Sequence, residues 1–107
     1  HKKGDEVLVE LSKLVKANIR TTDNFGRWGG DEFIIILPET VQEDAYTTAQ
    51  NLKGIVEIHN FPVSSQITSS FGVTGLKHED STEDMLNRVD HAMFDAKQKG
   101  KNFVKLA

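Results

Sequence analysis

The sequence predicts a single α+β domain built on an antiparallel sheet with helices packed on its faces. Three observations lead to this prediction: three segments show helical periodicity, a pair of glycines separates two strand-like runs, and further strand-like runs follow the second and third helical segments. The resulting order is helix, hairpin, helix, strand, helix, strand. A hairpin pairs its strands antiparallel, which favours α+β over a doubly wound parallel sheet. The length of 107 residues fits one small domain.

The first predicted element is a helix over residues 5–20. Its apolar residues recur at helical spacing and form one face: Val7, Leu8, Leu11, Leu14, Val15 and Ile19. Asp5 and Glu6 in the first turn and Arg20 at the end complement the helix dipole. An amphipathic helix needs an apolar surface to pack against. We therefore expect a further strand of the sheet to precede residue 1.

The second predicted element is a hairpin centred on Gly29 and Gly30. Glycines suit the two central positions of a type I′ turn, because both positions require positive φ. The strand-like run at residues 33–37 has no polar member, so it is predicted to be a central strand that is covered on both faces. Pro38 ends this strand.

A second helix is predicted over residues 41–59, and a strand over residues 63–74. The inward positions of the helix are Ala45, Ala49, Leu52, Ile55 and Val56. Pro62 separates the two elements. The strand is predicted from its content of Val, Ile, Thr and Ser.

A third helix is predicted to begin after Ser81 and to end at Gly100. Ser81 is a favourable N-cap, and Asp84 three residues later resembles a capping box. The inward residues of this helix are Met85, Leu86, Val89, Ala92, Met93 and Ala96. A last short strand is predicted over residues 102–106.

The composition excludes several classes of function. The chain contains no cysteine, so it offers neither a disulfide framework nor a thiolate zinc site. No apolar run approaches the roughly 20 residues that span a bilayer. The net charge is −3 and the basic residues are scattered, so no basic stripe for DNA is present. A phosphate-bearing ligand would need metal ions or a few placed cations to offset its charge.

The hairpin carries two adjacent carboxylates, Asp31 and Glu32, between a glycine turn and an apolar strand. Carboxylates beside a buried strand are costly unless a cation offsets them. Oxygen ligands at such a place suit Mg²⁺, which usually shares the phosphates of a substrate. Strand alternation points the two side chains to opposite faces, so we expect unequal roles. The alternative is a solvated hairpin tip, which the spacing alone favours.

The hairpin and four other stretches together resemble the GGDEF family. The hairpin contains the signature of the family, and the other stretches occur in the family's order over the whole chain. In chain order, the five stretches are His1 with Gly4-Asp5, the RxxD pair Arg20 and Asp23, Gly29-Gly30-Asp31-Glu32-Phe33, the SxG pair Ser70 and Gly72, and Asp90 to Lys97 with Gly100-Lys101-Asn102.

The resemblance implies a ferredoxin-like sheet of the nucleotidyl-cyclase type and a diguanylate cyclase activity. Such an enzyme condenses two GTP molecules into cyclic di-GMP and pyrophosphate, and each subunit of a homodimer holds one GTP. Asp31 would ligate Mg²⁺, or Mn²⁺ in its place, and help to deprotonate the attacking 3′-hydroxyl, with Glu32 assisting. Charge neutralisation and in-line positioning dominate this phosphoryl transfer.

The same resemblance assigns residues to substrate binding. Asp5 would bind the guanine edge, and His1 would contact the substrate nearby. Gly29 and Gly30 would let the nucleotide lie close to the backbone.

Lys97 and Lys101 would hold the triphosphate, and their spacing of four predicts a shared helix face. The family usually has arginine at the position of Lys101, and lysine lacks the bidentate fork, so we expect a weaker phosphate grip. The alternatives are a helix-terminal charge for Asp5 and a solvated lysine for Lys101.

Arg20 and Asp23 resemble the RxxD site at which the product, cyclic di-GMP, inhibits family members. A guanidinium can pair with a phosphate or a guanine edge. The alternative is a helix-terminal arginine beside a turn aspartate. The larger apolar residues near the motifs are interpreted as core: Trp28, Phe33, Phe71, Met93 and Phe94.

By this resemblance, residues 1–107 form a single partial GGDEF domain that lacks the N-terminal helix and the first strand of the family. An upstream metal-binding aspartate, a lysine and an asparagine of the family are absent, so we expect the 107-residue chain to be inactive alone. The alternative function is a catalytically inactive module that binds cyclic di-GMP or GTP. The intact Asp31–Glu32 pair favours the enzyme.

The resemblance also implies a cellular setting. We expect a bacterial cytoplasmic protein in which a sensory or receiver domain precedes this one, and such a protein can be tethered to a membrane sensor. The expected ligands are GTP and cyclic di-GMP. No DNA partner and no membrane segment are expected for this chain.

Overall fold

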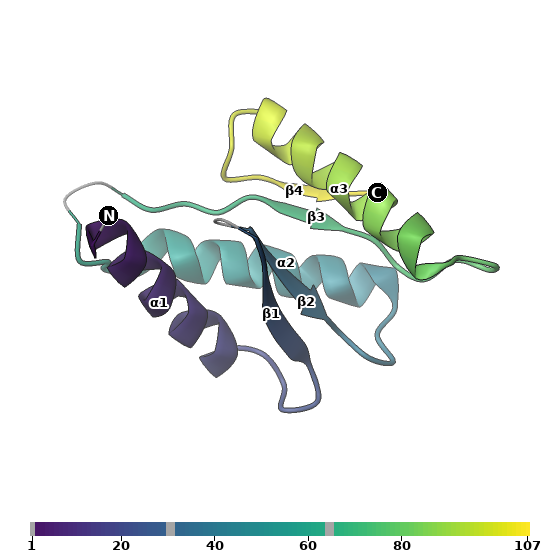
Figure 1. Ribbon diagram of the computed structural model, residues 1–107, viewed down its shortest axis with the longest axis horizontal. Helices are drawn as coiled ribbons and strands as arrows, with labels where there is room; N and C mark the ends of the chain where they lie inside the picture. The colour runs from purple at the N-terminus through teal and green to yellow at the C-terminus, as the bar shows by residue number, and fades with distance from the viewer. Residues whose placement is uncertain (1, 30–31, 64–65) are drawn as a thin grey trace.

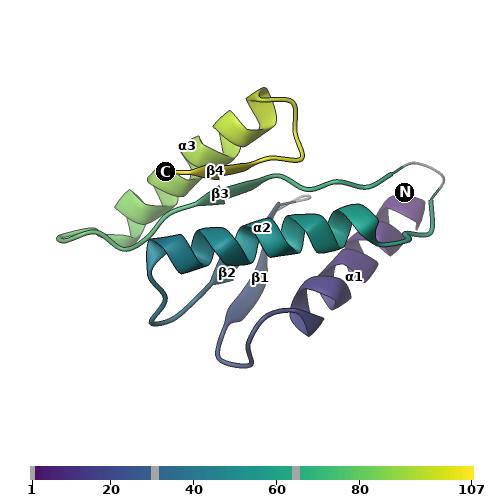
Figure 2. The same cartoon turned by 180° about the vertical axis from the view of Figure 1, so that it is seen from behind.

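The computed structural model describes residues 2–29, 32–63 and 66–107. Figures 1 and 2 show its elements from two sides: α1 (Lys2–Ala17), β1 (Asn24–Gly29), β2 (Glu32–Ile36), α2 (Gln42–Ile58), β3 (Phe71–Val73), α3 (Thr82–Gln98) and β4 (Val104–Leu106). This order is the predicted one, and the α+β class is confirmed. None of the described helices combines the length and apolar character that a bilayer crossing requires.

Local side-chain bonds set the ends of two helices. The Asn18 side chain donates to the Leu14 carbonyl at 2.8 Å, and α1 ends just before it, three residues earlier than predicted. The capping box that the sequence predicts for α3 is confirmed. The Ser81 hydroxyl accepts from the Asp84 amide at 3.0 Å, and the Asp84 carboxylate accepts from the Ser81 amide at 3.0 Å. These bonds satisfy amide groups that a helix start leaves without partners.

The predicted hairpin is confirmed, and its strands β1 and β2 pair antiparallel from Asn24–Ile36 to Gly29–Glu32. Gly29, predicted as a central residue of the turn, is instead the last residue of β1. The register shifts between Arg27 and Gly29, so that the strand bulges at this point. A bulge can re-aim a side chain near the end of a strand. Trp28, at the shift, is 57% exposed.

The strands β3 and β4 form a separate pair, and they run parallel. Phe71 lies opposite Val104, and Val73 lies opposite Leu106. Parallel neighbours need a long crossover connection, and α3 provides it. The strand predicted over residues 63–74 is therefore much shorter, since the ladder includes only the three residues of β3.

The core lies where α2 and the β3–β4 pair meet, and Figure 1 shows that pair between α2 and α3. Ala49 from α2, Val73 from β3 and Val104 from β4 form one buried cluster. Three predicted inward positions of α2 are confirmed as buried, namely Ala49, Leu52 and Val56.

The strand β3 lies very close to α3 at Gly72. A Cβ atom on Gly72 would lie 2.5 Å from the Met93 amide nitrogen and 2.6 Å from the Val89 carbonyl oxygen. Only glycine fits at this point without moving the helix. Ala92 and Ala96 of α3, both predicted to face inward, are 3% and 0% exposed. The backbone of α3 is thus fixed directly against β3.

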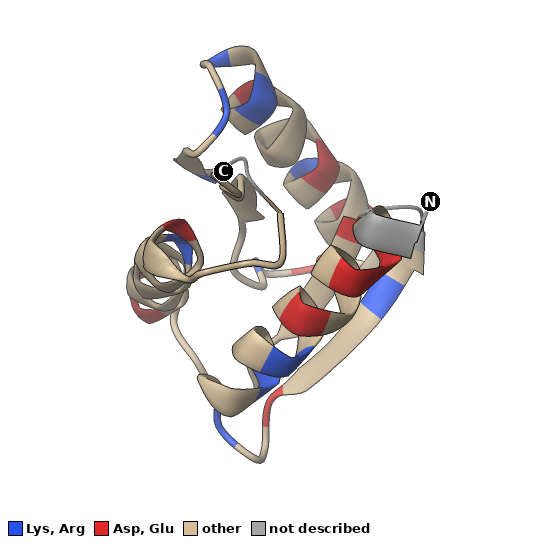
Figure 3. Cartoon of the chain, turned by 90° about the vertical axis from the view of Figure 1, so that its left-hand side faces the viewer, with Lys and Arg blue, Asp and Glu red and all other residues tan. Residues whose placement is uncertain are grey.

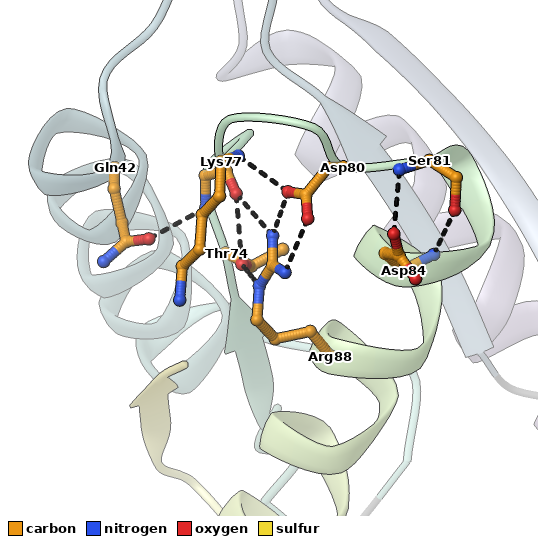
Figure 4. A network of polar contacts seen from close by, with 8 residues as sticks. Gln42, Thr74, Lys77, Asp80, Ser81, Asp84 and Arg88 are labelled. Carbon is orange, nitrogen blue, oxygen red and sulfur yellow. Dashed lines mark hydrogen bonds and ion pairs between the residues drawn. The ribbon is translucent and has the colours of Figure 1, made fainter.

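A polar network fixes the N-terminal half of α3 (Figure 4). The Arg88 guanidinium donates to the Asp80 carboxylate at 2.6 and 3.1 Å, to the Thr74 hydroxyl at 2.7 Å and to the Gly75 carbonyl at 2.9 Å. The Gly75 amide donates in turn to the Gln42 side chain at 2.9 Å. The network joins α3, the end of β3 and the start of α2.

The predicted burial of several apolar residues is wrong. Ile36 in β2 is 55% exposed, and every other residue of that strand is only partly buried. Within the described residues β2 pairs with β1 alone, so that its second edge has no strand partner. Trp28 and Phe94, interpreted as core, are 57% and 62% exposed. Phe33, Phe71 and Met93 are half-buried.

Candidate functional site

Glu32 is the first residue of β2, directly after the hairpin turn. The hairpin beneath it is stiffened by the rings of Phe25 and Phe33, which stack with their centroids 5.2 Å apart. Such aromatic pairs across an antiparallel ladder stabilise it. The Glu32 side chain is 43% exposed. It is therefore held at a fixed place on the strand while its carboxylate remains accessible.

Lys97 in the last turn of α3 approaches this carboxylate. Its Nζ lies 3.8 Å from Glu32 Oε2, and the lysine side chain is 46% exposed. The hairpin and α3 are far apart in sequence, and the predicted phosphate-binding lysine thus lies beside a predicted catalytic carboxylate. An exposed ion pair of this length contributes little to stability. Both groups are therefore available to a charged ligand.

Lys101 does not share a helix face with Lys97, and that prediction is wrong. The helix ends at Gln98, with Lys99 as its C-cap, and Lys101 has a left-handed backbone with φ of 64°. Gly100 before it and Asn102 after it also have positive φ. The Asn102 side chain donates to Glu57 at 3.0 Å and ties this turn to α2.

Basic residues gather at this end of α3, toward the top of Figure 3. Lys97, Lys99 and Lys101 lie within five residues and are exposed. These lysines make a local positive region. The chain as a whole carries a net charge of −3, so this region is not part of a general basic character. Lys101 adds to this region as an exposed point charge.

The structure does not place the other predicted substrate-binding residues beside Glu32 and Lys97. Asp5 is exposed in the first turn of α1, and no described contact joins it to Glu32 or Lys97. His1, Gly30 and Asp31 lie outside the described residues. Their predicted roles therefore stay predictions.

The described residues could bind Mg²⁺ only if a substrate supplied some of the oxygen ligands. The described residues contain no group of three or more His, Cys, Asp or Glu side chains that could hold a metal. Mg²⁺ is usually bound through one or two carboxylates together with substrate phosphates, rather than by an all-protein cage. Glu32 supplies one such carboxylate, with an accessible oxygen. A metal at this place would need phosphate oxygens to complete its ligands.

Arg20 and Asp23 meet in a second charged cluster, in the turn between α1 and β1. The Asp23 amide donates to the Arg20 carbonyl at 3.0 Å, which closes a four-residue turn. The Asp23 carboxylate accepts from the Arg20 amide at 2.8 Å and from the guanidinium Nη2 at 3.0 Å. The RxxD spacing is thus the spacing of one turn, and it pairs the two side chains with each other.

Arg20 and Asp23 shift each other's pKa. The side-chain hydrogen bonds between the partners lower the pKa of the Asp23 carboxyl and raise the pKa of the Arg20 guanidinium. The Asp23 side chain is 3% exposed, whereas that of Arg20 is 57% exposed. An incoming ligand therefore meets the guanidinium first.

Sequence reasoning missed Thr40 in this cluster. Its hydroxyl accepts from Arg20 Nη2 at 2.6 Å, across 20 residues of sequence. No motif marks this threonine, which lies between β2 and α2. A short polar residue just before a helix ordinarily indicates a cap, but here the N-cap is Val41.

A comparison with known families gives one match over nearly the whole chain. The model of the family described as "Diguanylate cyclase, GGDEF domain" matches residues 1–103. This agrees with the resemblance of the five sequence stretches.

Individual relatives agree with the family match. Diguanylate cyclase DgcM of Escherichia coli K12 is 35% identical over 104 residues, which are 97% of this chain and 25% of the relative. The structure of the active GGEEF domain of a diguanylate cyclase from Vibrio cholerae has a TM-score of 0.92 and 37% identity, over 99% of this chain and 69% of that one. Diguanylate cyclase SiaD of Pseudomonas aeruginosa, solved with its activator SiaC, has a TM-score of 0.93 and 34% identity, over 100% of this chain and 42% of that one. The chain spans about a quarter of the curated relative's length.

Proposed function

The chain belongs to the GGDEF, diguanylate cyclase, family, and we propose that the protein containing it condenses two GTP molecules into cyclic di-GMP as a homodimer. The observation that carries this proposal is the approach of Lys97 to Glu32 at 3.8 Å. It places a cation suited to phosphate and a carboxylate suited to a metal side by side. The two come from different family stretches, the hairpin and the end of α3.

The proposed reaction forms two phosphodiester bonds. The 3′-oxygen of each GTP attacks the α-phosphorus of the other, and each attack expels one pyrophosphate. Asp31 takes the proton of the 3′-hydroxyl, while Lys97 and Lys101 offset charge on the phosphate oxygens. Magnesium, when bound, would supply further neutralisation of that charge. One domain holding one GTP cannot close the ring, so two copies must face each other.

Glu32 has a different task from Asp31 in this scheme. Its carboxylate is attached to a strand that the hairpin fixes, and it lies 3.8 Å from Lys97 Nζ while remaining 43% exposed. We assign it to the metal and to the orientation of Lys97 before nucleotide binds. Asp5 would select guanine by accepting from its N1–H and its amino group, with His1 nearby.

We also propose that cyclic di-GMP inhibits the enzyme at Arg20 and Asp23. The support is the exposed guanidinium, which the turn and Thr40 hold in place. A guanidinium binds phosphate oxygens through paired N–H donors. Regulation by the rest of the protein, such as a preceding sensory or receiver domain, would act by bringing two GGDEF domains together.

The test uses the full-length protein that contains this chain. Incubation with GTP and Mg²⁺ should yield cyclic di-GMP and pyrophosphate, and Asp31→Ala should abolish both products. Glu83→Gln, which removes an exposed carboxylate in the first turn of α3, is the matched control and should leave the rate unchanged. Product formation by Asp31→Ala at the wild-type rate would refute the proposed role. Tight binding of cyclic di-GMP by a wild type without turnover would instead favour a receptor.

A further inference from the structure

We infer that Thr40 is a positioning residue of the product site, and that it aims the Arg20 guanidinium at a phosphate of cyclic di-GMP. The inference rests on the proposed inhibitory role of Arg20. It adds a residue that belongs to none of the five family stretches.

The Thr40 hydroxyl has a fixed orientation. It donates its single proton to the Pro38 carbonyl at 2.9 Å. The hydroxyl oxygen can therefore act only as an acceptor toward other groups. Arg20 Nη2 donates to it at 2.6 Å. Because the acceptor is neutral and the donor charged, this bond is of the stronger kind. The guanidinium is therefore held by Thr40, which lies just before α2, as well as by the turn that contains Arg20 itself.

Asp23 holds the same guanidinium from the other side. Its carboxylate accepts from Nε at 3.3 Å and from Nη2 at 3.0 Å, and from the Arg20 amide at 2.8 Å. With its side chain 3% exposed, the carboxylate is directed at Arg20 rather than outward. The guanidinium is therefore held by Asp23 on one side and by Thr40 on the other.

The remaining edge of the guanidinium is the part that can meet a ligand. None of the bonds to Asp23, Thr40 or Pro38 uses Nη1. The side chain as a whole is 57% exposed, and these bonds leave the N–H donors of Nη1 for a ligand while Nε and Nη2 stay fixed. A preorganised donor loses less conformational freedom when it binds. Removing the Thr40 hydroxyl should therefore weaken binding without removing any contact to the ligand.

The experiment measures cyclic di-GMP binding to the full-length protein by titration calorimetry, with five proteins compared. Wild type is set against Arg20→Ala, Thr40→Val, Thr40→Ser and the control Thr47→Val. Valine keeps the shape of threonine without its hydroxyl, and serine restores the hydroxyl. Thr47 bonds only to a carbonyl of its own helix, at 3.1 Å.

We expect Thr40→Val to raise the Kd about fivefold, because one hydrogen bond to a charged group is lost. Thr40→Ser should bind within about twofold of wild type, since it keeps that bond. Thr47→Val should bind like wild type. A Thr40→Ser variant as weak as Thr40→Val would overturn the role of the hydroxyl, and so would a Thr40→Val variant that binds like wild type.

The result for Arg20→Ala separates this inference from the function on which it rests. Weak binding by Arg20→Ala together with normal binding by Thr40→Val removes the inference and leaves the product site in place. Normal binding by Arg20→Ala removes both. Thermal melting of each variant is measured in parallel, and a recovery of affinity in Thr40→Ser at unchanged melting temperature excludes a purely structural effect.

Discussion

The two ends of α3 are held in opposite ways. At the N-terminal half, Arg88 and Asp80 bond at 2.6 and 3.1 Å, and their side chains are only 21% and 8% exposed. At the C-terminal end, Lys97 and Glu32 approach only to 3.8 Å, and both side chains are nearly half exposed. Between the ends, Gly72 lets the helix lie against β3. The N-terminal half of α3, the fixed end, is therefore held by the Arg88–Asp80 hydrogen bonds. The C-terminal end, the open end, leaves Lys97 and Glu32 accessible to a charged ligand.

The largest expected effect comes from removing the negative charge of Glu32 at the open end of α3. Glu32→Gln should lower kcat for cyclic di-GMP synthesis by about 100-fold, because the proposed Mg²⁺ would lose a carboxylate ligand and neutralise the phosphates less well. The melting temperature should stay within error, since an exposed pair contributes little to stability. Rate and melting curve are measured on the same full-length protein. A marked loss of stability would place Glu32 in the structure rather than in the chemistry.

A smaller effect is expected from the packing between the ends. Gly72→Ala inserts a Cβ 2.5 Å from the Met93 nitrogen, so α3 must move away from β3. We expect a loss of about 2 kcal/mol in the free energy of unfolding, as for other overpacked sites. Denaturant unfolding measures this loss, with Gly26→Ala as the control because nothing lies near a Cβ at that position. Equal stability of the two variants would contradict the close packing.

The stabilisation that Asp80 gives at the fixed end of α3 should be lost in acid. Hydrogen bonds from Arg88, and then from the Lys77 amide, lower the pKa of Asp80 from 3.8 to about 2. A depressed pKa in the folded state means that the stabilisation is present above the ordinary value and is lost as pH falls through the folded one. The melting temperature of wild type should therefore fall between about pH 4 and pH 2, partly through Asp80. In Asp80→Asn this fall should be shallower, and an unchanged slope would show that Asp80 is not a cause.

The smallest effect is expected at Lys101. Lys101→Arg restores the bidentate fork on an exposed turn, and it should lower the KM for GTP by about twofold to threefold. Steady-state kinetics on the full-length protein measures the change, with kcat expected to stay constant. A KM that does not change would leave Lys101 as a solvated residue without a role in phosphate binding.

The local parts of the fold could be predicted because their causes are local. Apolar spacing placed α2 within one residue of its ends, and Ser81 with Asp84 placed the start of α3. The hairpin followed from two glycines, although Gly29 lies in the strand because the register shifts at Trp28. The short extent of β3 could not be predicted, since ladder length depends on which strand lies alongside.

The site was predictable only in part, for a related reason. Family stretches predicted roles for Glu32 and Lys97, but their approach depends on the packing of α3 on β3, which no single stretch encodes. The spacing of Lys97 and Lys101 predicted a shared face, and the left-handed turn at Gly100 removed it. Thr40 was missed because its partner, Arg20, lies 20 residues away.

The central claim is that the open end of α3 binds the nucleotide's phosphates. The most direct measurement is a calorimetric titration of a nonhydrolysable GTP analogue, with Mg²⁺, into the full-length protein and its Lys97→Met variant. The claim predicts a Kd about fivefold higher for the variant, since one charge-assisted contact to phosphate is lost. Equal affinity of the two proteins would contradict it.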